Sequence, residues 1–204
     1  MLRNHWKLFI AVLSLNLGVV VSAMAAVEVG QSAPDFSLMD TKGASHKLSD
    51  YKGKFVVLEW VNPDCPFVHK HYDSKNMQNL QTQYTSQGVV WLSINSSVEG
   101  KQGHYSSEEN DRIVQEREAH PTAVLLDGAG DVGRLYGAQT TPHMFIIDPQ
   151  GTLIYQGAID NTPTPDPAAI PNSVNYVRQA LDEAMSGKPV SVAATKSYGC
   201  SVKY

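Results

Sequence analysis

The sequence has few cysteines, no cluster of basic residues and no apolar run long enough to span a membrane. Two cysteines in 204 residues are too few for a disulfide scaffold. The net charge of −4 and the lack of a basic patch argue against a nucleic-acid partner. The chain also contains no internal repeat, no low-complexity block and no nucleotide-binding motif. What remains is enough chain for one domain with a single buried core.

The first 25 residues have the pattern of an export signal. Arg3 and Lys7 precede an apolar run at residues 8–21, and Ala23 and Ala25 give the small-x-small pattern that signal peptidase cleaves. The run is about 14 residues, whereas a spanning helix takes roughly 20, so cleavage is favoured over an uncleaved anchor. No cysteine follows the run for lipid attachment. The prediction is an exported, periplasmic protein without a membrane anchor after cleavage.

Short apolar runs alternate with helical patterns in the rest of the chain. Strands are expected at residues 55–61, 89–94 and 123–127, with hairpins at 36–48 and 144–159. Helices are expected at residues 66–87, 111–120, 131–136 and 173–186, and an irregular proline-rich loop at 161–171. This order predicts an α/β domain over residues 26–189 with a mixed central sheet flanked by helices, an N-terminal hairpin and an insertion after the second core strand. Residues 190–204 would form a C-terminal tail.

Cys65 lies between a buried strand and the start of a helix. Unpaired backbone N–H groups and the helix dipole at such a position favour a thiolate, the nucleophilic form of cysteine. Pro66 follows in the first turn, where its missing N–H is tolerated. The neighbouring charge of Asp64 opposes ionisation, so the direction of the Cys65 pKa stays open. An inert cysteine is the alternative, although such residues more often lie in the middle of a strand or on an apolar helix face.

Glu59 is a carboxylate in the middle of an apolar strand. Its burial is costly unless the group is paired or serves a function, and burial would raise its pKa toward values that suit proton transfer. The alternative is a carboxylate that reaches solvent at the end of the sheet.

His69 and His71 follow Cys65, and His143 follows Pro142. His69 or His71 together with Cys65 could bind copper or zinc. Residues two apart on a helix do not share a face, so solvent-facing histidines are the favoured interpretation. His143 is expected at the rim of the site. No metal ion and no cofactor are predicted.

The segment from Leu58 to Val68 resembles the thioredoxin pattern of strand, loop, W-C-G-P-C and helix. In this resemblance Cys65 falls on the first, attacking cysteine, and Val68 replaces the second. Glu59 falls on the buried carboxylate that manages protons for the thiols. Thr141 and Pro142, directly before a strand, fall where thioredoxin-like proteins carry a cis-proline that faces the active-site cysteine, beside backbone that pairs with substrate.

Residues 57–72 and 136–157, together with the Gly-Cys ending, resemble the alkyl hydroperoxide reductase/thiol-specific antioxidant (AhpC/TSA, redoxin) group and its peroxiredoxin-like bacterial members. The resemblance implies a thioredoxin-like fold and a thiol oxidoreductase, with Pro66, Thr141 and Pro142 at the substrate. Peroxiredoxins carry P-x-x-x-T/S-x-x-C at the peroxidatic cysteine. Leu58 and Asn62 replace that proline and hydroxyl here, so two parts of the peroxide pocket are missing.

Cys200 lies on the tail, which could fold back over the active site. Its attack on a Cys65 sulfenic acid or mixed disulfide would form a Cys65–Cys200 disulfide, and a structural tether or an unrelated free thiol is the alternative.

The leading hypothesis is therefore an exported thiol-disulfide oxidoreductase or peroxiredoxin-like antioxidant protein. Its partners would be a dithiol protein reductant and a disulfide-containing protein substrate, or a peroxide. The alternative is a non-enzymatic thiol or copper/zinc-binding protein, similar to a metallochaperone, on the same fold.

Overall fold

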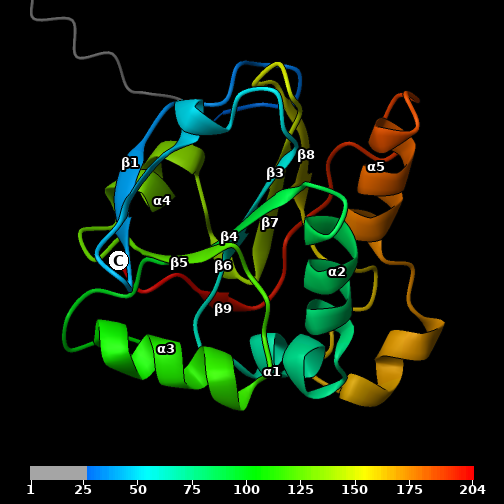
Figure 1. Cartoon of the computed structure of the whole chain (residues 1–204). Coiled ribbons are helices and arrows are strands. Elements are labelled where there is room, and N and C mark those ends of the chain that lie inside the picture. The colour runs from blue at the N-terminus through cyan, green and yellow to red at the C-terminus, as the bar shows by residue number, and fades with distance from the viewer. Residues whose placement is uncertain (1–26) are drawn as a thin grey trace, which may run out of the picture.

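The computed structural model describes residues 27–204 as one mixed sheet covered on both faces by helices (Figure 1). The predicted signal peptide lies outside these described residues. Within residues 27–204, no helix has both the length and the apolar character needed to cross a membrane.

The main sheet has seven strands. Their spatial order is β2 (Ser45–Lys47), β1 (Ser37–Asp40), β5 (Ala123–Leu126), β4 (Val90–Asn95), β3 (Val56–Trp60), β7 (His143–Ile147) and β8 (Leu153–Gly157). Strand β4 runs parallel to both β3 and β5, whereas β7 and β1 add antiparallel strands on either side. This arrangement confirms the predicted mixed sheet and the N-terminal hairpin.

Helices cover the two faces of the sheet unequally. Helices α1 (Pro66–Asp73), α2 (Asn76–Thr85) and α5 (Tyr176–Met185) lie on one face, and the short α4 (Asp131–Tyr136) lies on the other (Figure 1). A hydrophobic core lies on each face of the sheet, and alternate residues of β3 point into one or the other. Leu58 and Trp60 pack toward α4, and Val57 packs toward α1 and α2. Two 3-10 turns, Leu48–Tyr51 and Pro167–Asn172, complete the elements, the second inside the expected proline-rich loop.

The predicted long helix at residues 66–87 is two helices. Lys75 adopts a left-handed conformation with φ of 60°. The first helix ends where the N–H groups of Ser74 and Lys75 donate to the carbonyls of Lys70 and Tyr72. No glycine or proline marks the break, so the sequence pattern could not reveal it. The change of direction leaves α1 beside the active site while α2 packs along the sheet.

The insertion after β4 contains α3 (Ser107–Glu116), which begins four residues earlier than expected. Its start is a capping box: Ser106 accepts the N–H of Glu109, and the Glu109 carboxylate accepts the N–H of Ser106. This S-x-x-E pattern is present in the sequence and would have located the helix start.

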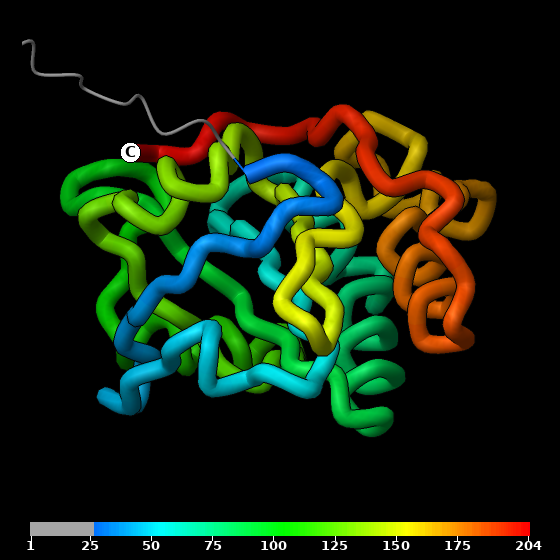
Figure 2. The backbone as a smooth tube through the Cα atoms, turned by 90° about the horizontal axis from the view of Figure 1, so that it is seen from above, coloured from blue at the N-terminus to red at the C-terminus, as the bar shows by residue number. Residues whose placement is uncertain are grey.

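The C-terminal tail is attached to the rest of the domain. It crosses the molecule from α5 to the C-terminus (Figure 2), and its strand β9 (Cys200–Ser201) pairs antiparallel with β6 (Thr140–Thr141). Thr141 lies opposite Cys200 in this register. Gly199, with φ of 136°, allows the close approach, because a Cβ there would lie 2.1 Å from the carbonyl oxygen of Thr141.

Candidate active site

Cys65 caps the N-terminus of α1 and is fully buried. Its carbonyl accepts the N–H groups of Val68 and His69, both at 2.9 Å, and Pro66 occupies the first turn as expected. Its Sγ donates to the carbonyl oxygen of Thr141 at 3.0 Å. The peptide bond between Thr141 and Pro142 is cis. The structure therefore brings together the predicted Cys65, Thr141 and Pro142.

The tail adds Cys200 to this cluster. Both cysteines are free thiols, and Cys200 is partly exposed while packing against the core that contains Cys65. The Thr141 hydroxyl is buried and has no hydrogen-bond partner among the described residues. Cys65 therefore lies between the apolar core on the α1 side and the backbone of β6 and β9 on the other.

The two thiols have pKa values that move in opposite directions. Burial alone raises the pKa of Cys65, but the neighbouring Cys200, Thr141 and the Val68 N–H outweigh it and lower that pKa. Burial and the proximity of the Cys65 sulfur raise the pKa of Cys200 to about 11. The first proton to leave the pair is therefore that of Cys65, which becomes the thiolate while Cys200 stays protonated.

The residues just before Cys65 are bound to the insertion loop. The Asp64 carboxylate accepts hydrogen bonds from the Tyr105 hydroxyl at 2.7 Å and the Gly103 N–H at 3.0 Å. The Asn62 side chain, at the position of the peroxiredoxin hydroxyl, accepts the Asp64 N–H and donates to the carbonyl of Gln102. Asn62 therefore fixes the loop that carries the cysteine.

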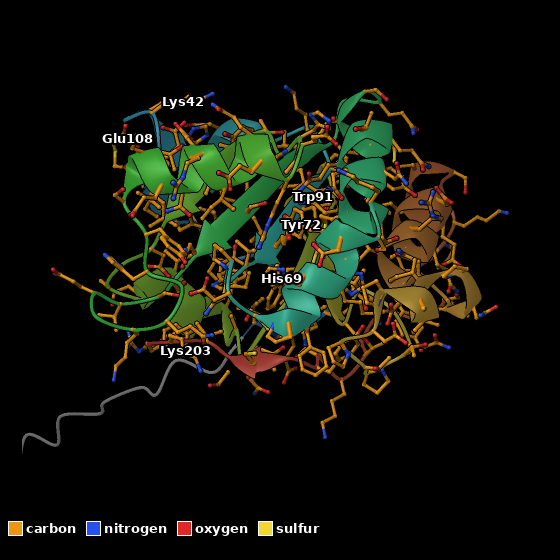
Figure 3. The ribbon with its side chains drawn as sticks, turned by 90° about the horizontal axis from the view of Figure 1, so that it is seen from below. Lys42, His69, Tyr72, Trp91, Glu108 and Lys203 are labelled. Atoms are coloured by element: carbon orange, nitrogen blue, oxygen red, sulfur yellow. The ribbon has the colours of Figure 1, made fainter. Side chains whose placement is uncertain are left out.

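Glu59 is completely buried on the face of the sheet that carries α1 and α2, so the alternative of a solvent-reaching carboxylate is wrong. Its carboxylate accepts four hydrogen bonds, from the side chains of Tyr72, Gln81, Trp91 and Ser93. Tyr72 of α1 and Trp91 of β4 are labelled next to each other in Figure 3, and both donate to Glu59. Burial raises the pKa of Glu59, and the four donors oppose that rise only in part.

This raised pKa predicts a pH-dependent stability. A carboxyl whose pKa is higher in the folded than in the unfolded protein contributes stability below about pH 4.5, and that contribution is lost as the pH rises through the folded pKa. Each unit of upward shift is worth about 1.4 kcal/mol. Urea unfolding of the wild type and of Glu59→Gln from pH 4 to pH 8 measures the effect, because glutamine fits the same cluster without ionising.

The wild type is expected to lose stability relative to Glu59→Gln across this range. The glutamine oxygen can accept from Trp91 and Ser93, and its amide can donate to the Tyr72 hydroxyl. A difference between the two proteins that stays constant with pH would contradict the expectation.

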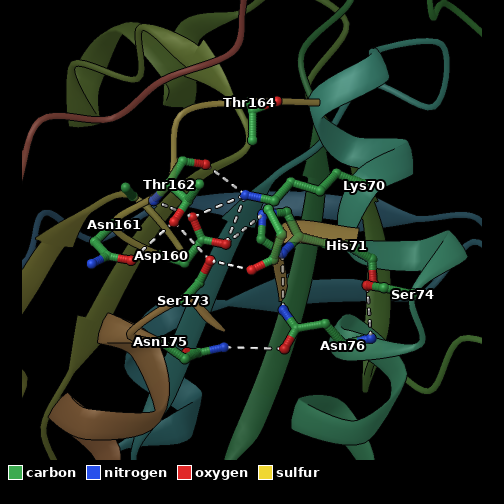
Figure 4. Close-up of polar contacts among 12 residues, drawn as sticks. Lys70, His71, Ser74, Asn76, Asp160, Asn161, Thr162, Thr164, Ser173 and Asn175 are labelled. Carbon is green, nitrogen blue, oxygen red and sulfur yellow. Dashed lines mark hydrogen bonds and ion pairs between the residues drawn. The ribbon is translucent and has the colours of Figure 1, made fainter. Parts of the chain in front are cut away.

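A second buried polar cluster lies beside the site and was not predicted (Figure 4). Lys70 on α1 is fully buried, and its ammonium donates to both oxygens of Asp160 at 3.1 and 2.8 Å and to the carbonyl of Thr162 at 2.6 Å. It also donates to the hydroxyl of Tyr198 at 3.0 Å, and that hydroxyl donates to Asp160. The cluster joins the helix of Cys65 to the tail two residues before Cys200.

The histidine predictions need correction. His71 is fully buried, not solvent-facing: its ring contacts Asn76 at 2.9 Å and lies 3.9 Å from Asp160, and burial lowers its pKa to about 4. His69 is about half exposed on the outer side of α1 (Figure 3). His143 is buried instead of lying at a rim, and burial lowers its pKa to about 4 as well.

Within residues 27–204, no three His, Cys, Asp or Glu side chains lie close enough together to hold a metal ion. His71, the one histidine of α1 that points inward, is held by Asn76.

The family model described as AhpC/TSA matches residues 29–156, which carry β1 to β8 and Cys65. The chain belongs to the AhpC/TSA family. This membership confirms the resemblance seen in the sequence. The thioredoxin-like fold is confirmed as well, since the solved structures that resemble the chain include the thioredoxin domain of a thiol-disulfide oxidoreductase.

Three individual proteins are similar to this AhpC/TSA protein. The thiol-disulfide oxidoreductase ResA of Geobacillus thermodenitrificans is 32% identical over 128 residues, covering 63% of this chain and 68% of that protein. The selenocysteine-containing peroxiredoxin PrxU of Peptoclostridium acidaminophilum is 32% identical over 136 residues, covering 62% and 66%. The crystal structure of an uncharacterized conserved protein from Geobacillus kaustophilus superposes with a TM-score of 0.73 at 28% identity, covering 87% and 92%. The predicted class, a thiol oxidoreductase, agrees with the two named activities.

Proposed function

We propose that this AhpC/TSA protein is an exported thiol-disulfide oxidoreductase in which Cys65 and Cys200 form a reversible intramolecular disulfide. One observation carries the proposal: β9 pairs with β6 so that Cys200 lies opposite Thr141, whose carbonyl accepts the Cys65 thiol. Two cysteines separated by most of the chain meet beside a cis-proline. A purely structural tether would need no lowered pKa at one of its sulfurs.

The roles of the two thiols follow from their order of ionisation. Cys65, the more acidic thiol, is the nucleophile that attacks a disulfide. Attack converts its thiolate into a neutral mixed disulfide, which removes a charge that holds the Cys200 pKa high. Cys200 then ionises more easily and attacks the Cys65 sulfur, releasing the substrate thiol and closing the internal disulfide.

Thr141, Pro142 and Glu59 have supporting roles in this proposal. The carbonyl of Thr141 holds the Cys65 sulfur, and cis-Pro142 orients that backbone. Glu59 is bonded to Tyr72, Gln81, Trp91 and Ser93, so proton exchange with the thiols would pass through these side chains or water.

Disulfide exchange fits the site better than peroxide reduction. The Asn62 side chain that replaces the peroxiredoxin hydroxyl is engaged with the insertion loop. The relative named ResA is a thiol-disulfide oxidoreductase, which supports disulfide-containing protein substrates and a dithiol protein as reductant. Export is proposed from the signal-peptide pattern of residues 1–25.

Mass spectrometry after treatment with oxidised glutathione tests the proposal. The wild type is expected to show a two-proton mass loss that joins the peptides containing Cys65 and Cys200. In Cys200→Ser the resolving thiol is missing, so a glutathione adduct should persist on Cys65. Separate adducts on both cysteines of the wild type, without a bond between them, would refute the internal disulfide. The intact mass also tests export, because cleavage after Ala25 leaves a chain that starts at Ala26.

A further inference from the structure

Tyr198 anchors the tail two residues before Cys200. Its hydroxyl donates to the Asp160 carboxylate and accepts from the Lys70 ammonium at 3.0 Å. The phenol therefore uses both its donor and its acceptor capacity. Its ring also packs edge to face against Phe67 of α1, with the ring centroids 5.7 Å apart. None of these contacts takes part in the proposed thiol chemistry, yet they hold the chain next to its second thiol.

The seat of this hydroxyl is the buried Lys70–Asp160 pair, which the rest of the chain holds in place. The ammonium lies 3.1 and 2.8 Å from the two carboxylate oxygens (Figure 4). The Thr162 N–H donates to the same carboxylate at 2.9 Å, and the Thr162 carbonyl accepts from the ammonium. Backbone pairing between Asp160 and Asn175 fixes this segment to the start of α5. The tail therefore docks onto an ion pair whose two members are positioned by other elements.

The seat and the nucleophile belong to one helix. Cys65 caps the N-terminus of α1, and Lys70 lies in α1 five residues later, so the helix geometry fixes the separation of the two residues. On the tail, one residue lies between Tyr198 and Cys200. That residue is Gly199, whose φ of 136° fits its close approach to β6. A tyrosine bound to the seat therefore places Cys200 within a fixed reach of Cys65.

We propose that Tyr198 is a positioning residue for the second step of the exchange, in which Cys200 attacks the Cys65 sulfur of the mixed disulfide. The inference rests on the proposed internal disulfide. In that step Cys200 gives its proton to water and forms a bond to the Cys65 sulfur. The bond between Cys65 and the substrate sulfur breaks, its electron pair leaves with the substrate sulfur, and the resulting thiolate takes a proton from water. Over both steps the chain loses two electrons and the substrate disulfide gains them.

The position of Cys200 depends on contacts at its flanks, because β9 pairs only two residues with β6. An intramolecular attack is fast only while the nucleophile is held near its target, and its rate scales with the fraction of molecules in that arrangement. A hydrogen bond to a charged group shifts such an equilibrium by about ten- to a hundredfold. Without the Tyr198 hydroxyl, the tail should leave its seat in a larger fraction of molecules, and closure of the disulfide should slow accordingly.

Rapid mixing of the reduced full chain with oxidised glutathione tests the role of the hydroxyl. An acid quench and the intact mass follow three species, namely the reduced chain, the glutathione adduct of Cys65 and the internal disulfide. In Tyr198→Phe, which keeps the ring, closure of the internal disulfide is expected to slow at least about tenfold, so that the adduct accumulates. The first step is measured alone in the Cys200→Ser background, where adding Tyr198→Phe should not slow formation of the adduct.

Tyr84→Phe is the matched control, because the Tyr84 hydroxyl also donates to a carboxylate, and its partners Asp182 and Arg178 lie on α5. This variant loses the same kind of hydrogen bond and should change the closure rate by less than about twofold. The inference is overturned if Tyr198→Phe closes as fast as the wild type, if it slows both steps equally, or if Tyr84→Phe slows closure as much. A wild type that never forms the internal disulfide would refute the proposed function, and this inference with it, whereas unchanged closure in Tyr198→Phe refutes the inference alone.

Discussion

Replacing Lys70 with methionine is expected to lower the free energy of unfolding by about 3–5 kcal/mol, as measured by urea unfolding. Lys70 and Asp160 are both buried, and the ammonium lies 2.8 Å from the carboxylate. Removing the cation leaves Asp160 as a buried charge with the Tyr198 hydroxyl and the Thr162 N–H as its remaining donors. An unpaired buried charge costs several kcal/mol, which is why the loss of one partner matters more than the loss of both.

Two further variants show whether the burial of the pair is the cause. In Lys70→Met combined with Asp160→Asn no charge remains, so part of the lost stability should return. Lys75→Met removes an exposed lysine on the same stretch of chain, whose partner Glu118 is also exposed, and should cost less than about 1 kcal/mol. A loss for Lys70→Met no larger than that for Lys75→Met would contradict the assignment of a buried ion pair.

Replacing Cys65 with serine is expected to reduce catalysed disulfide exchange to the rate seen without protein. A serine hydroxyl does not form the anion that attacks a disulfide at neutral pH, and it cannot take part in an internal disulfide. The measurement is reduction of an insulin-type disulfide substrate by a dithiol donor, followed over many turnovers. Far-UV circular dichroism of the same sample verifies that the fold is intact.

Cys200→Ser is the matched variant, since it removes the other sulfur and keeps the helix start and cis-Pro142. It should react once per molecule, leaving Cys65 in a mixed disulfide, and then fail to turn over. Persisting activity in Cys65→Ser would sink the proposed mechanism, and full turnover in Cys200→Ser would remove the resolving role of the tail.

Much of the fold could be predicted because its signals are local. The runs around Val57 and Trp91 are apolar and β-branched over the length of a buried strand, and both form central strands. The hairpin turns are marked by short glycine-containing segments. The break at Lys75 escaped prediction because the left-handed conformation is uncommon for a residue other than glycine.

The active site likewise contains residues that the sequence revealed and residues that it did not. Cys65 could be found because a strand, a short loop and a proline-started helix are contiguous in the sequence. Lys70 and His71 could not, because a helix pattern does not indicate which face a distant loop and the tail will cover. Tyr198 gave no signal either, since its hydroxyl matters only through Asp160 and Lys70, which lie far from it in the chain.

The sequence by itself determined the succession of core strands along the chain, the cysteine at the start of α1 and the carboxylate in the middle of β3, because each depends on neighbours within a few residues. Only the tertiary structure decided that the tail returns to β6, that Cys200 lies over Cys65 and that Lys70 is buried against Asp160. These features are pairings between residues more than 50 positions apart. Their stability comes from hydrogen bonds and ion pairs that exist only in the folded chain, and no local pattern encodes them.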